Sequence, residues 1–270
     1  MQVRELMRRE VVTVKESDTL ALAMQMLLWS GFHHLPVMRE GKVVGLLSER
    51  DVLKKVDVSK PLAIEGVVAD VMSQPVQTVP PSISVEEAAA ILAREHYGCL
   101  PVVETGDLVG IVTTTDVLGW IAQCPIEQSA EPTAGDIATR KVIAARKGEL
   151  LLDAASRMAH AGVRHLPIID GLNRVQGILS DRDVRNLTGR SLIDLAETER
   201  LDYLDRLKVE DAMTEEPRML AEDTPLTEVL GAFLDDRFGA LPVVDDEDHL
   251  LGILSYIDVL RFYRMQLKAP

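Results

Sequence analysis

The chain has 270 residues, 47% of which are hydrophobic, and its formal net charge is −14. This length is typical of one or two domains, and the apolar content is sufficient for a sizeable core. The negative charge disfavours non-specific binding to DNA, RNA or anionic lipid, because such partners need a basic surface. We therefore expect neither a nucleic-acid partner nor a membrane partner.

The sequence also lacks signals of export and of metal chemistry. Residues 1–6 contain no hydrophobic region of a signal peptide, and no apolar run approaches the ~18–20 residues of a membrane-spanning helix. Cys99 and Cys124 lie in no spacing typical of metal ligands or of a redox pair. We expect a cytoplasmic protein with no metal site and no covalent cofactor.

The first sixty residues begin with a helix, a strand and a second helix. Residues 3–7 form a short helical lead-in, and the β-branched run at residues 11–14 is typical of a strand. Ser17 or Asp18 can cap the helix that follows, and Gly31 ends it.

A hairpin and a further helix complete this first unit. Pro36 opens a strand, residues 40–41 form the turn, and residues 43–47 form the next strand. Because this strand is apolar at both alternating positions, it should be buried on both faces. Ser48 begins a helix through Lys55, so the unit is β-α-β-β-α.

The same pattern returns three times along the chain. Each copy holds Gly, two aliphatic residues, Ser or Thr, two variable residues and Asp, and a Leu-Pro pair stands fifteen or sixteen residues before the Asp. The copies occupy residues 45–51, 110–116, 177–183 and 252–258. In the second copy, residues 76–79 are the expected first strand, and Ser84 with Glu87 forms a capping-box pattern. A doubled signal at a nearly fixed spacing indicates internal repeats.

These repeats define the expected domain organisation. Repeats at about 1–60 and 66–124 form a first pair over 1–124, and repeats at about 133–190 and 208–270 form a second pair over 133–270. Residues 125–132 are the linker. The insertion at about 191–207 is predicted as an amphipathic helix, which either covers the core of the second pair or docks a partner.

The apolar residues of the paired strands are the predicted core. They are Leu46, Leu47, Val102, Ile111, Val112, Ile178, Leu179, Val243, Ile253 and Leu254.

The repeated Ser or Thr with an Asp three residues later has two interpretations. A hydroxyl at a helix N-cap and an acid in the first turn stabilise the start of a helix, which alone explains four copies. The same geometry also forms an anion site beside a carboxylate, and an ionised carboxylate can accept hydrogen bonds from the hydroxyls of a ribose. An adenosine phosphate offers one diol and one anion close together.

Basic residues favour the second interpretation in the odd-numbered repeats. Repeat 1 has His33 and His34 before its Leu-Pro pair, and repeat 3 has Arg164 and His165. Arg50 and Arg182 stand directly before the Asp in the same two repeats, whereas repeats 2 and 4 hold Gly98-Cys99 and Gly239-Ala240 before their Leu-Pro pairs. Arginine suits phosphate recognition through its fork of donors.

The two motifs and their period resemble the CBS domain over nearly the whole chain. This resemblance implies an α/β (α+β) fold in which four repeats form two pseudo-twofold Bateman modules, with adenine nucleotides or other adenosyl ligands bound in clefts between repeats. It assigns the ribose to the four Asp residues and the phosphate to the neighbourhood of the four hydroxyls. These residues are Ser48, Asp51, Thr113, Asp116, Ser180, Asp183, Ser255 and Asp258.

A member of that family, the nucleotide-sensing subunit of AMP-activated kinase, holds phosphates with basic residues before the Leu of the strand. His33, His34 and the pair Arg164-His165 match such positions, whereas Cys99 and Ala240 depart from them. The resemblance therefore implies phosphate binding through the odd-numbered repeats.

The leading hypothesis is a non-catalytic regulatory protein that binds AMP, ADP, ATP or a related adenosyl compound and signals to a separate protein effector. The sequence holds no nucleophile elbow, Walker motif or Cys and His cluster, so we expect neither enzymatic activity nor a catalytic residue. The alternative is a ligand-independent scaffold or oligomerisation module, in which the repeated Ser or Thr and Asp residues only cap helices. Two chains can also pair as a homodimer through their modules.

Overall fold

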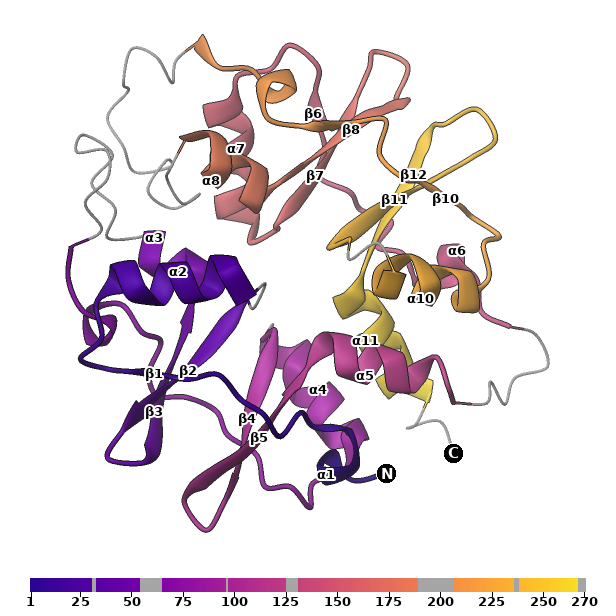
Figure 1. Ribbon diagram of the computed structural model, residues 1–270. Helices are drawn as coiled ribbons and strands as arrows, with labels where there is room; N and C mark the ends of the chain where they lie inside the picture. Colours follow the sequence, from indigo (N-terminus) through magenta and orange to yellow (C-terminus); the bar gives the residue numbers. More distant parts are fainter. Residues whose placement is uncertain are drawn as a thin grey trace. The chain divides into compact units, whose positions relative to one another are not determined.

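The computed structural model describes residues 1–30, 33–53, 65–95, 97–124, 131–188, 206–235 and 238–266 (Figure 1). The chain divides into two compact units, Met1–Ile121 with Tyr263–Pro270, and Ala122–Phe262. Both units mix short helices with small sheets, which confirms the predicted α+β fold of four repeats.

The first repeat follows the predicted order of elements. Its elements are α1 (Val3–Leu6), β1 (Val14–Lys15), α2 (Leu20–Ser30), β2 (His34–Arg39), β3 (Lys42–Ser48) and α3 (Glu49–Leu53). β1 pairs parallel with β2, and β2 pairs antiparallel with β3. Glu40 and Gly41 form the hairpin turn with φ of 49° and 80°. A two-residue turn with positive φ matches the twist of the paired strands, and glycine adopts that conformation readily.

Two local expectations in this unit are wrong. The side chain of Thr19, not of Ser17 or Asp18, accepts from the start of α2, because the Leu22 N–H lies 3.3 Å from Thr19 Oγ1. Residues 76–79 do not form a strand, because only Val79 makes a bridge to Val102. The remaining elements of the second repeat are η1 (Val68–Asp70), α4 (Val85–Glu95), β4 (Cys99–Glu104), β5 (Asp107–Thr113) and α5 (Thr114–Ile121).

The second unit repeats the arrangement. Its first half holds α6 (Ala134–Ile137), β6 (Ala145–Arg146), α7 (Leu151–Ala161), β7 (His165–Ile169), β8 (Val175–Ser180) and α8 (Asp181–Thr188). Its second half holds η3 (Val209–Asp211), β9 (Thr214–Glu215), β10 (Leu220–Ala221), α10 (Leu226–Asp235), β11 (Ala240–Val244), β12 (Leu250–Ser255) and α11 (Tyr256–Gln266). Most of the insertion predicted at 191–207 lies outside the described residues.

The lead-in segments, which begin the repeats (residues 2–9, 66–74, 133–140 and 207–215), cross to the other repeat of their unit. Arg8, at the start of repeat 1, exchanges backbone hydrogen bonds of 2.9 Å with Ile111 of repeat 2. In the opposite direction Ser73 bonds Leu46 through N–H to carbonyl distances of 2.8 and 3.1 Å. The second unit has the same exchange, since Thr139 bonds Ile253 and β9 pairs with β8. Each repeat is therefore completed by its neighbour.

This crossing explains the glycine that opens the repeated stretch in the first three repeats. A Cβ atom added to Gly45 would lie 2.6 Å from Met72 Sδ, and the same holds for Gly110 against Met7. In the third repeat a Cβ on Gly177 would lie 2.7 Å from Met213 Sδ. The glycine thus leaves room for the methionine of the incoming lead-in segment.

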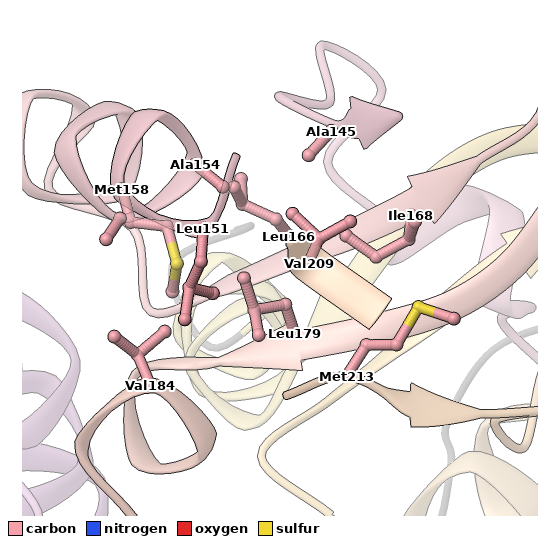
Figure 2. Close-up of a cluster of buried hydrophobic side chains, with 11 residues drawn as sticks. Ala145, Leu151, Ala154, Met158, Leu166, Ile168, Leu179, Val184, Val209 and Met213 are labelled. Carbon is pink, nitrogen blue, oxygen red and sulfur yellow. The ribbon is translucent and has the colours of Figure 1, made fainter. Parts of the chain in front are cut away.

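The core of each repeat lies between its helices and its hairpin, and it includes apolar residues of the crossing segment. Figure 2 shows this for repeat 3, where Val209 and Met213 from the next lead-in segment lie beside Leu166 and Leu179 of the hairpin. Repeat 1 has an equivalent cluster, to which Val68 contributes.

Six of the ten predicted core residues are buried, and four are half-buried. The half-buried residues are Leu46, Ile111, Ile178 and Ile253. Because side chains alternate along a strand, these four point away from the helices, whereas the next residue in each strand points toward them. On the opposite face the crossing segments leave them partly covered, so the prediction of complete burial on both faces is wrong.

None of the helices within the described residues is both long enough and apolar enough to pass through a membrane.

Candidate functional site

Strand pairing brings the two sequence motifs of each repeat together. The residue two positions before the Pro lies directly opposite the Ser or Thr of the repeated stretch. The facing pairs are His34 and Ser48, Cys99 and Thr113, His165 and Ser180, and Ala240 and Ser255. The candidate site of each repeat is therefore the end of a hairpin at the start of a helix.

The Asp of each repeat caps the turn that joins the strand to the helix. In repeat 3, Asp183 Oδ2 accepts from the Ser180 N–H at 2.8 Å and from Ser180 Oγ at 2.5 Å. The Asp183 N–H donates back to Ser180 Oγ at 3.2 Å, which completes a reciprocal cap. In all four repeats Oδ2 accepts from the same backbone and hydroxyl donors, so the cap interpretation is confirmed.

The second carboxylate oxygen is engaged from outside the repeat in two cases. Arg8 Nε lies 3.2 Å from Asp116 Oδ1, and Thr139 Oγ1 donates to Asp258 Oδ1 at 3.1 Å. Both partners come from the lead-in segment of the other repeat in the same unit. A carboxylate has about four lone-pair sites, so neither bond saturates Oδ1.

Sequence reasoning missed this contribution of the lead-in segments. The four crossing positions are polar, with Arg8, Ser73, Thr139 and Thr214 bridged to the first aliphatic position of the facing repeated stretch. Aligning the repeats would have found this polar position. No local pattern, however, says that a lead-in segment pairs with the neighbouring repeat.

The histidines of the odd-numbered repeats fill space that glycines of the even-numbered repeats leave open. A Cβ atom on Gly239 would lie 2.5 Å from His165 Nε2, and a Cβ on Gly98 would collide with the imidazole of His34. The Gly98 and Gly239 positions, which the sequence showed only as departures from a basic pattern, are therefore explained by packing.

Burial sets the protonation of two groups near these sites. Loss of solvent lowers the pKa of His165 to about 4, with Asp183 opposing and Arg164 adding to the shift. Without a ligand, His165 is therefore a neutral imidazole at pH 7. Burial also raises the pKa of the Cys99 thiol to about 12, which keeps it protonated.

The other basic residues named from the sequence lie mainly at the surface. His33, Arg164 and Arg182 are exposed and His34 is half-buried. The side chain of Arg50 lies outside the described residues. Among those residues, no group of three or more His, Cys, Asp and Glu side chains is placed to hold a metal ion.

Comparison with known proteins identifies a family. The model of the CBS domain matches residues 3–58, 68–123, 134–188 and 209–264. The uncharacterized protein MJ1225 of Methanocaldococcus jannaschii is 26% identical over 272 residues, covering 94% of this chain and 96% of that protein. Its crystal structure, described as that of a proposed archaeal homologue of γ-AMPK, superposes with a TM-score of 0.79 at 24% identity and covers 97% of this chain and all of that one.

Two further matches differ in extent. A conserved protein of Pyrococcus horikoshii has the same fold, with a TM-score of 0.68 and 20% identity over 97% of this chain and 99% of that chain. A stretch of 110 residues, 40% of this chain, is 37% identical to inosine-5'-monophosphate dehydrogenase of Korarchaeum cryptofilum. The match covers only 22% of that enzyme.

Proposed function

We propose that this chain, which belongs to the CBS domain family, is a non-catalytic regulatory protein that binds adenosine-type ligands. AMP, ADP, ATP or a related adenosyl compound would place its ribose on the repeated Asp and its phosphate near the Ser or Thr. A protein effector, or pairing of two chains, would receive the signal.

The observation that carries this proposal is the fourfold cap geometry. In each repeat the cap fixes one carboxylate oxygen, so the other oxygen is held at a constant position relative to a hydroxyl and a helix start. Such a preorganised acceptor suits a diol, because little side-chain freedom is lost when the ligand binds. Arg164 and Arg182 are both exposed. Arg182 follows Ser180 by two residues, and Arg164 precedes His165, which pairs with Ser180, so both can reach a phosphate there.

The absence of catalytic activity is the second part of the proposal. The four matched ranges take up most of the chain, and the longest stretch between two matches is residues 189–208. A catalytic domain would need more chain than these connectors supply. Release of product from AMP, ADP or ATP during incubation with the protein would contradict this part.

Ligand-induced stabilisation tests the binding. At a ligand concentration of 100 Kd, one site adds about 2.7 kcal/mol to the free energy of unfolding. Thermal unfolding with AMP, ATP and adenosine should show this gain, and Asp183→Asn should reduce it. Asp153→Asn, at an exposed position on α7, removes the same charge away from the site and should keep the full gain.

The scaffold alternative gives the opposite result. If the Asp residues only cap helices, Asp183→Asn lowers stability equally with and without ligand. An intact chain that none of these ligands stabilises would overturn the proposed function and favour the scaffold.

A further inference from the structure

The sites of repeats 2 and 4 are equivalent in architecture but differ in charge. Arg8 is bridged to Ile111, and Thr139 is bridged to the matching Ile253. From these places Arg8 Nε contacts Asp116 Oδ1 at 3.2 Å, whereas Thr139 Oγ1 contacts Asp258 Oδ1 at 3.1 Å. A cation therefore stands in one unit where a neutral hydroxyl stands in the other.

Arg8 has donors left for a ligand. Its guanidinium carries five N–H donors, and the contact with Asp116 uses the one on Nε. Within the described ranges, its terminal nitrogens have no hydrogen-bond partner. The Arg8 side chain is 62% exposed and that of Asp116 is 10% exposed, so a largely buried carboxylate holds a solvent-facing guanidinium beside the cap. A guanidinium in this state is suited to bidentate phosphate recognition.

The same position is neutral in the other three repeats. Ser73 and Thr214 are bridged to Leu46 and Ile178, at the places that Arg8 and Thr139 take in the even-numbered repeats. Arg8 is thus the single cation among the four crossing positions.

Resting on the proposed function, we infer that Arg8 is the specificity-determining residue of the Asp116 site and selects adenosine ligands that carry a phosphate. With a ribose on Asp116, the remaining donors of Arg8 face the anionic end of the ligand. The Asp258 site, with Thr139 in the same place, accepts uncharged adenosyl ligands as well as nucleotides. Phosphate selection is therefore not confined to the odd-numbered repeats, because a lead-in segment delivers an arginine to an even-numbered one.

Two substitutions and one matched control test this assignment. Arg8→Thr gives unit 1 the residue found in unit 2, and Thr139→Arg makes the reverse change. Arg9→Thr is the control, because Arg9 is exposed, carries the same charge and donates to the Arg4 carbonyl at 3.4 Å instead of to Asp116. All three positions are at the surface, where substitutions usually leave the fold intact. Each intact chain is titrated calorimetrically with AMP and with adenosine.

Arg8→Thr should raise the Kd for AMP about tenfold at one site, because one charged hydrogen bond is lost. The Kd for adenosine should change less than about threefold. Thr139→Arg should increase the affinity for AMP relative to that for adenosine at one site. Arg9→Thr should leave the Kd for both ligands within about threefold of the native values. Equal losses for AMP and adenosine in Arg8→Thr, or equal effects of Arg8→Thr and Arg9→Thr, would overturn the inference while the proposed function stands. A native chain that binds neither ligand would overturn both.

Discussion

At the scale of single residues, the sites combine a structural cap with groups whose protonation is set by packing. Asp183 illustrates the first point, because its Oδ2 accepts from both the N–H and the hydroxyl of Ser180 at the start of α8. His165 illustrates the second, because it lies opposite Ser180 and against Gly239 and loses its charge there. The sequence suggested a basic group at this position, because the identity of a residue does not reveal how deeply its side chain is buried.

The neutral state of His165 predicts a pH dependence of stability. Its pKa is lowered from 6.5 to about 4 on folding, so between these values the unfolded chain binds a proton that the folded chain does not. Stability should therefore fall as pH falls from 6.5 toward 4, by at most about 3 kcal/mol. Urea unfolding at pH 7 and pH 5 should show a smaller decrease in His165→Asn than in the native chain.

The exposed His160 provides the control for this experiment. His160→Asn removes a histidine from the same repeat and should retain the full pH dependence. If His165→Asn and His160→Asn reduce the decrease equally, His165 is not the group responsible.

The two cysteines should differ in reactivity. Burial raises the pKa of the Cys99 thiol to about 12, and its side chain is 2% exposed, so the nucleophilic thiolate is nearly absent at pH 8. Cys124 is half-buried. Iodoacetamide should label Cys124 in the folded protein and Cys99 only after unfolding, which peptide mass spectrometry can follow. Rapid native labelling of Cys99 would show that the end of β4 opens readily.

At the scale of elements, local patterns predicted the hairpins well. The Leu-Pro pair and the glycine stretch are joined by a short turn, so their pairing follows from chain proximity and alternating burial. The crossing of the lead-in segments could not be predicted in the same way. Met7 and Met72 follow similar short helices, and which hairpin each covers is decided by packing between repeats.

The contact between Gly45 and Met72 gives a test of this packing. Gly45→Ala places a methyl group 2.6 Å from Met72 Sδ, and we expect it to cost about 1–3 kcal/mol of stability. Met72→Ala alone leaves a cavity and should cost about 2–5 kcal/mol. In the double variant the new methyl group enters that cavity, so the combined cost should be less than the sum. Additive costs in denaturant unfolding would mean that the two residues do not pack together.

At the scale of the whole molecule, the folding unit differs from the repeat that the sequence displays. A sequence repeat such as residues 3–58 runs from its own lead-in segment to its last helix. In the structure, that lead-in segment completes the neighbouring repeat, and the next lead-in segment completes this one. The two repeats of a unit therefore depend on each other for their packing.

This exchange predicts that a substitution in one repeat loosens the other. Val3, at the start of repeat 1, is buried, and its N–H bonds the Ile83 carbonyl of repeat 2 at 2.9 Å. Val3→Ala should cost about 1–3 kcal/mol, and hydrogen exchange of the intact chain should quicken in α4 and β5 more than in α2 and β3. Val68→Ala, at the buried start of the second lead-in segment, should have the reverse pattern, because Val68 packs in the core of repeat 1. If exchange instead quickens only in the repeat whose sequence contains the substitution, the crossing is contradicted. The truncated side chain would then have supported the elements of its own repeat.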